Sequence, residues 1–178
     1  MGGKRYGRGA GRVALTGVLT ALSLVFLWIS AVAPAGRLGL VAVAGVFPAG
    51  AVVSAGLGAG FFCYGATGLL GLILLPAKSS AVLYLLFFGL WPMMKSLLER
   101  LNSRFLEWAG KLAVFNVILS VCWFGLRSLF LPFLPPVLDA GWMVYAAGNV
   151  AFVIYDLGFS KLIAFYVARV DRALRSGA

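Results

Sequence analysis

Long apolar stretches alternate with short polar, glycine- or proline-containing connections along the chain. Six stretches are dominated by apolar residues: 13–33, 38–55, 58–75, 79–95, 112–131 and 141–166. Their lengths are close to the roughly 20 residues that a helix needs to cross a hydrocarbon layer about 30 Å thick. Pro34, Gly56 and Pro76 punctuate the connections. The pattern predicts an all-α polytopic membrane protein, a bundle of six transmembrane helices that forms one integral membrane domain over residues 1–178.

The composition agrees with this interpretation. Hydrophobic residues make up 62% of the chain and charged residues 11%, which is too apolar for a soluble domain of this size. The first stretch has a basic flank, as a signal peptide does, but Val13–Val32 is longer than the roughly 7 to 15 apolar residues of a signal peptide. We therefore expect a retained first helix.

The basic residues indicate the orientation of the six helices. One side of the predicted bundle carries Lys4, Arg5, Arg8, Arg12, Lys95, Arg100, Arg104, Lys111, Arg169, Arg172 and Arg175. The opposite side has Arg37 and Lys78, with Arg127 just inside the membrane edge. Cytoplasmic connections of membrane proteins are enriched in Lys and Arg. Both termini are therefore predicted to be cytoplasmic, and a nucleic-acid partner is not expected.

The connection between the fourth and fifth stretches has an amphipathic pattern. Leu97, Leu101, Phe105 and Trp108 recur at helical spacing, opposite Glu99, Arg100, Arg104 and Glu107. This pattern predicts an interfacial helix on the cytoplasmic surface. It can be a plain connector, anchored by Trp108 and a Glu107–Lys111 pair, or a docking surface for a partner.

Polar and aromatic side chains form one face of each of the last two helices. They are Asn116, Ser120, Trp123 and Arg127 on the fifth, and Trp142, Tyr145, Asn149, Asp156 and Ser160 on the sixth. Because such faces avoid lipid, the two are expected to meet. We predict a small-molecule pocket with Trp123, Arg127, Trp142, Tyr145 and Asn149 as substrate-binding residues, and a polar brace between Asn116 and Asp156. The alternatives are a polar seam without a ligand and, for Arg127, simple snorkelling to the membrane surface.

Small residues line one face of the first helix. Ala10, Ala14, Gly17 and Ala21 follow one another at steps of four, three and four. Small residues let helices approach closely in lipid, where apolar burial contributes little to association. The stripe is predicted to dock a partner subunit, with packing against a helix of the same chain as the alternative.

The sequence gives no indication of an enzyme. It has no histidine, no paired intramembrane carboxylates, no Gly-x-Ser-x-Gly motif and no nucleotide-binding GxxxxGK[ST] loop. We expect no catalytic residues, no metal and no cofactor.

The chain resembles the substrate-binding S components of energy-coupling factor transporters. The resemblance rests on Ala10-x-x-x-Ala14 and Gly17-x-x-x-Ala21, on the Gly-rich stretch from Ala55 to Pro76, and on the polar outer half of the last helices. It implies a bacterial cytoplasmic-membrane protein that captures a vitamin or other small molecule. The implied partners are a transmembrane T component, which docks on the small-residue stripe, and ATPase subunits. The alternative is a non-catalytic membrane scaffold similar to the cell-shape protein MreD.

Overall fold

The computed structural model describes residues 3–100, 103–126, 128 and 141–176. Most of these residues are helical and none lies in a β-strand, which confirms the all-α prediction for the described part of the chain. The elements are α1 (Gly3–Val32), α2 (Arg37–Ala44), α3 (Val46–Ala55), α4 (Leu57–Leu74), α5 (Lys78–Leu83), the π-helical segment η1 (Tyr84–Phe88), α6 (Trp91–Leu98), α7 (Arg104–Ser120), the π-helical segment η2 (Val121–Gly125) and α9 (Gly141–Ser176).

Six helical segments of the described chain are long and apolar enough to cross a membrane. They are Gly9–Val32, Arg37–Ala55, Leu57–Leu74, Lys78–Leu98, Arg104–Gly125 and Gly141–Arg169. The predicted number of such helices is confirmed, and most boundaries lie within a few residues of the expected ones. The fifth differs most, because it begins at Arg104 instead of residue 112.

Two of the six segments are interrupted where proline prevents a regular helix. Proline lacks an amide hydrogen and its ring clashes with the carbonyl group four residues earlier. Pro48 lies four residues after Ala44, where α2 ends, and Pro92 lies four residues after Phe88, where η1 ends. The two interruptions contact each other, since a Cβ atom at Gly45 would collide with the carbonyl of Phe88. Glycine is therefore needed where the second segment meets the fourth.

The connection between the second and third segments was expected at Gly56, as a turn. Gly56 connects α3 to α4 with a φ of 96°, a backbone conformation that residues with a side chain rarely adopt. The predicted turn is thus present, and glycine at this position permits it.

The predicted interfacial helix is not present in the described residues between Leu97 and Trp108. α6 ends at Leu98, Ser103 is extended, with φ −133° and ψ 122°, and α7 runs without a break from Arg104 to Ser120. The described part of the amphipathic pattern is divided between α6 and α7, and no separate interfacial helix is shown there. Lys95 and Lys111, which we assigned to the cytoplasmic flank, are buried inside the bundle.

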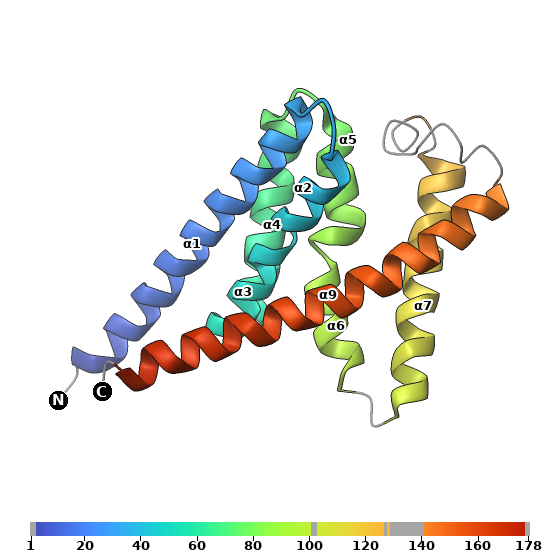
Figure 1. The fold of residues 1–178 in the computed structure, drawn as a ribbon. Coiled ribbons are helices and arrows are strands. Elements are labelled where there is room, and N and C mark those ends of the chain that lie inside the picture. Colours follow the sequence, from blue (N-terminus) through green and yellow to red (C-terminus); the bar gives the residue numbers. More distant parts are fainter. Residues whose placement is uncertain (1–2, 101–102, 127, 129–140, 177–178) are drawn as a thin grey trace.

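The helices form a close-packed group and a more open arm (Figure 1). α1, α2, α3 and α4 pack against one another, while α7 stands apart from α1 and α4 and contacts α6, η1 and α9. α9 crosses the molecule obliquely and also contacts α3. The N- and C-terminal ends lie at the same end of the molecule. An aromatic core joins the two parts through η1, α6 and α9, and it includes Tyr84, Phe87, Phe88, Trp91, Phe152 and Phe159.

Candidate functional site

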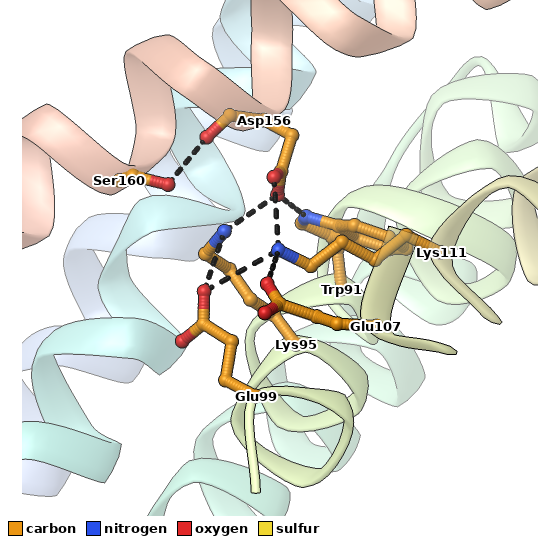
Figure 2. A network of polar contacts seen from close by, with 7 residues as sticks. All are labelled: Trp91, Lys95, Glu99, Glu107, Lys111, Asp156 and Ser160. Atoms are coloured by element: carbon orange, nitrogen blue, oxygen red, sulfur yellow. Dashed lines mark hydrogen bonds and ion pairs between the residues drawn. The ribbon is translucent and has the colours of Figure 1, made fainter. Parts of the chain in front are cut away.

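Asp156, the carboxylate in the last helix, lies at the centre of a buried ion cluster (Figure 2). Its Oδ1 accepts hydrogen bonds from Nζ of Lys95 at 2.7 Å and from Nε1 of Trp91 at 3.1 Å. Its Oδ2 accepts one from Nζ of Lys111 at 3.1 Å. Lys95, Lys111 and Asp156 are at most 3% exposed. One carboxylate therefore links α6, α7 and α9.

Two glutamates complete the ion cluster, which consists of Lys95, Glu99, Glu107, Lys111 and Asp156. Nζ of Lys95 lies 2.9 Å from Oε1 of Glu99, and Nζ of Lys111 lies 2.6 Å from Oε1 of Glu107 and 3.4 Å from Oε1 of Glu99. The Glu99 side chain is 45% exposed, so the cluster reaches the molecular surface at its Glu99 edge. Buried charges require counter-charges and hydrogen bonds. Lys95 has two carboxylate partners and Lys111 has three.

The predicted brace between Asn116 and Asp156 is not formed. Lys95, Lys111 and Trp91 are the partners of the Asp156 side chain, whereas the Asn116 side chain bonds Asn149. Ammonium groups make stronger hydrogen bonds to a carboxylate than an amide does. The two lysines thus take the place that we assigned to Asn116.

The polar faces of α7 and α9 do meet, as predicted. The side-chain amides of Asn116 and Asn149 bond each other reciprocally, at 2.9 and 3.0 Å, and the hydroxyl groups of Ser120 and Tyr145 lie 2.6 Å apart. These four residues form a polar seam. Because their polar groups satisfy one another, the contact matches the alternative of an interhelical seam.

An apolar cavity of about 420 Å³ lies between α2, α5 with η1, α7 with η2, and α9. Its lining includes Ala42, Phe87, Phe115, Cys122, Ala147 and Phe152, and none of the described residues that line it is charged. The lining comes in part from α2 and from the N-terminal part of α9, and both lie away from the chain ends (Figure 1). A volume in this range is typical of small-molecule sites, which span about 300 to 1,000 Å³.

Aromatic rings separate the cavity from the ion cluster. Phe115 and Phe152 stack with centroids 4.5 Å apart, and Phe87 lies 5.5 Å from Phe115. Trp91 contacts Phe152 at 4.9 Å edge-to-face and does not line the cavity itself. These four residues form an aromatic floor. Since the indole of Trp91 also donates to Asp156, the floor and the ion cluster share a residue.

The predicted substrate-binding residues do not line the cavity where they are described. Tyr145 and Asn149 belong to the polar seam, and Trp142 is 74% exposed. The indole of Trp123 lies against Gly141, with Nε1 3.5 Å from the position that a Cβ there would take. Arg127 lies outside the described residues. Trp123 follows the lining residue Cys122 in sequence, but neither Trp123 nor Trp142 lines the cavity, so the contact of either with a substrate stays a prediction.

The small-residue stripe of α1 faces outward. Ala10, Ala14, Gly17 and Ala21 are all exposed, and a Cβ atom at Gly17 would meet nothing within 4 Å. α1 packs into the bundle through another face, which includes Thr16, Thr20, Ser23 and Leu27. Packing of the stripe against a helix of the same chain is therefore excluded within the described residues.

The described residues contain no group of side chains that indicates a metal or cofactor site. The chain has no histidine, and no group of three Cys, Asp or Glu side chains gathers within the described residues so as to hold a metal ion. Comparisons with known protein families, with curated proteins and with solved structures find no match to this chain. The function must therefore be inferred from its own residues.

Sequence reasoning did not find Trp91, Lys95 and Lys111 as partners of Asp156. A signal was present, because Lys95–Glu99 and Glu107–Lys111 are both spaced four residues apart and each lysine adjoins apolar sequence. Such pairs occupy one face of a helix. Hydropathy alone assigned both lysines to the membrane surface, where the positive-inside pattern normally places them.

Proposed function

We propose that the protein is a membrane-embedded capture subunit for a small molecule, part of an importer whose energy comes from separate ATPase subunits. The observation that supports this most is the apolar cavity of about 420 Å³ between four of the six segments. A cavity walled by apolar side chains is the usual form of a small-molecule site. A resemblance to S components of energy-coupling factor transporters makes a vitamin-like substrate the first class to test.

The proposed orientation places the cavity on the outside of a bacterial cytoplasmic membrane. Basic residues gather near both chain ends, whereas α2 and the N-terminal part of α9, which help to line the cavity, lie toward the opposite end of the molecule (Figure 1). With the basic end in the cytoplasm, the cavity opens toward the exterior. A substrate arriving from outside then meets the cavity before the ion cluster.

The proposed partner surface is the small-residue stripe of α1. Its exposed residues leave room for close approach of a helix from a transmembrane coupling subunit. The capture subunit itself is proposed to be non-catalytic, since the chain lacks a nucleotide-binding loop and histidine.

Native mass spectrometry of the gently purified protein tests this proposal. The expected result is a retained small molecule together with co-purified ATPase and coupling subunits. A protein that retains no molecule and co-purifies with cell-shape proteins instead would be a membrane scaffold. Ala147→Phe, which adds a ring to the cavity wall, should abolish retention, whereas Ala146→Phe on the neighbouring exposed position should not.

A further inference from the structure

We infer that the cavity takes an uncharged, apolar molecule or apolar group, an inference that rests on the proposed capture function and narrows its substrate class. The lining consists of aliphatic and aromatic side chains, with the thiol of Cys122 and the ring of Tyr155 as its most polar members. The Tyr155 hydroxyl is itself buried and has no hydrogen-bond partner in the described chain. Apart from this one hydroxyl, the described walls offer a ligand dispersion contacts.

No counter-charge is available to a charged ligand in the described part of the cavity. The nearest buried cations, Lys95 and Lys111, lie behind the aromatic floor and are already paired with Asp156, Glu99 and Glu107. Placing an unpaired carboxylate or phosphate in apolar surroundings is strongly unfavourable. The cavity should therefore discriminate against anions of the same size and shape.

The polar seam does not supply hydrogen bonds to the cavity either. The amides of Asn116 and Asn149 and the hydroxyls of Ser120 and Tyr145 bond one another, and none of the four residues belongs to the lining. A polar ligand would have to break these bonds to gain hydrogen bonds from the seam. A ligand without polar groups leaves them intact.

The deep end of the cavity favours ligands with rings. Phe87, Phe115 and Phe152 line it, and the stacked pair of Phe115 and Phe152 is nearly parallel, with an angle of 13° between the rings. Aromatic rings prefer offset-stacked or edge-to-face neighbours. A flat, uncharged ring system entering from the open side meets such neighbours on the floor.

A pair of probes with one skeleton and different charge tests the inference. The protein in lipid nanodiscs is titrated with 2-naphthylmethanol, which is neutral, and with 2-naphthoate, which is anionic. Alkylation of Cys122 by N-ethylmaleimide is followed by peptide mass spectrometry, with the buried, non-lining Cys63 as the internal reference. Saturating naphthylmethanol should slow alkylation of Cys122 about ten-fold, and naphthoate less than two-fold. The reference Cys63 should react at the same rate throughout.

Variants show whether the protection arises in the cavity. Naphthylmethanol should raise the melting temperature of the unmodified protein and of Ala146→Phe by about 5 °C, and that of Ala147→Phe by nothing measurable. Ala146 and Ala147 are adjacent and both exposed, but only Ala147 lines the cavity. The Ala146→Phe protein thus controls for the added ring.

The apolar ligand can be a free small molecule or the chain of a phospholipid. Extracting and identifying the molecules that co-purify with each variant distinguishes these two sources. A free small molecule should be retained by the unmodified protein and lost from Ala147→Phe. If a phospholipid is retained and lost in the same way, the apolar group in the cavity is a lipid acyl chain instead. Equal, cavity-dependent protection by naphthoate would overturn the inference while leaving the capture function standing. If Ala147→Phe changes neither the effects of the two probes nor the set of co-purified molecules, then both this inference and the proposed capture function are wrong.

Discussion

At the residue scale, a carboxylate inside an apolar helix is tolerated because neighbouring ammonium groups neutralise its charge. Asp156 receives two ammonium groups and one indole N–H, all within 3.1 Å. Breaking a buried ion pair by removing one partner typically costs about 3 to 5 kcal/mol, since it strands the other charge. Lys161, five residues further along α9, is exposed and forms none of the ion pairs of this cluster in the described structure, so the two neighbouring charges have different roles.

Two substitutions of Asp156 should distinguish how much its charge and its hydrogen bonds each contribute to the free energy of unfolding. We expect Asp156→Leu to lower the free energy of unfolding by about 3 to 5 kcal/mol, because Trp91 loses its acceptor and both lysines lose a counter-charge. Asp156→Asn should cost about 1 to 3 kcal/mol, because the amide oxygen keeps one bond and each lysine keeps a glutamate. Unfolding in mixed micelles of mild detergent and dodecyl sulfate measures both.

Lys161→Met is the matched control for these variants. It removes an exposed charge from the same helix and should change stability by less than about 0.5 kcal/mol. If it destabilises as much as Asp156→Leu does, the effect comes from α9 as a whole and not from the ion cluster.

At the scale of elements, hydropathy located the helices well and their partners only in part. Apolar stretches of this length are expected to be helical in lipid, because each backbone N–H and C=O group needs a partner there, and six helices long and apolar enough to cross a membrane are present in the described residues. Polar periodicity also identified the contact of α7 with α9, through Asn116 and Asn149. Neither hydropathy nor polar periodicity shows whether a lysine side chain lies at the membrane surface or is buried inside the bundle. The amphipathic stretch that ends near Lys111 was therefore assigned to an interfacial helix.

The site was less predictable than the fold for a related reason. The stripes correctly gathered polar residues, but a cavity forms where side chains leave a gap, here between four helices distant in sequence. Its apolar lining looks like ordinary helix surface in the sequence. Phe87, Phe115 and Phe152 come from three different helices, and no spacing within one helix reveals that they meet.

The reciprocal amide pair makes a quantitative prediction about the α7–α9 contact. Asn116→Leu alone should destabilise the protein by about 1 to 2 kcal/mol, since it leaves the Asn149 amide with an unmet bond. Adding Asn149→Leu should recover part of that loss and give a coupling energy of about 0.5 to 1.5 kcal/mol in a double-mutant cycle. Additive effects of the two substitutions would mean that the pair does not hold α7 against α9.

At the scale of the whole molecule, the two ends of the bundle differ in chemistry. The apolar cavity lies toward one end, the ion cluster lies behind the aromatic floor, and the small-residue stripe runs along the outside of α1. Trp91 connects the first two, because it packs on Phe152 and donates to Asp156. A ligand that displaces Phe152 would therefore act on the contact that joins α6, α7 and α9.

The small-residue stripe should matter for assembly and not for folding. Gly17 has open space around it, so Gly17→Leu should change stability by no more than about 0.5 kcal/mol, while co-purification with the proposed coupling subunit is lost. Gly158→Leu is the control, since Gly158 is an exposed helical glycine of α9 with equally open surroundings. Loss of assembly in both variants would indicate a general effect of added bulk, and loss in neither would place the partner elsewhere.

The orientation of the bundle decides which side supplies the ligand. In a background with Cys63→Ala and Cys122→Ala, single cysteines introduced at Gly2 and Gly177 should react with a membrane-impermeant maleimide only after the cytoplasmic side is opened, because basic residues flank both ends. A cysteine at Ala35, in the exposed connection between α1 and α2, should react from outside in intact cells. Labelling of position 2 or 177 from outside would invert the bundle. The cavity would then face the cytoplasm, and a role in uptake from the exterior would be untenable.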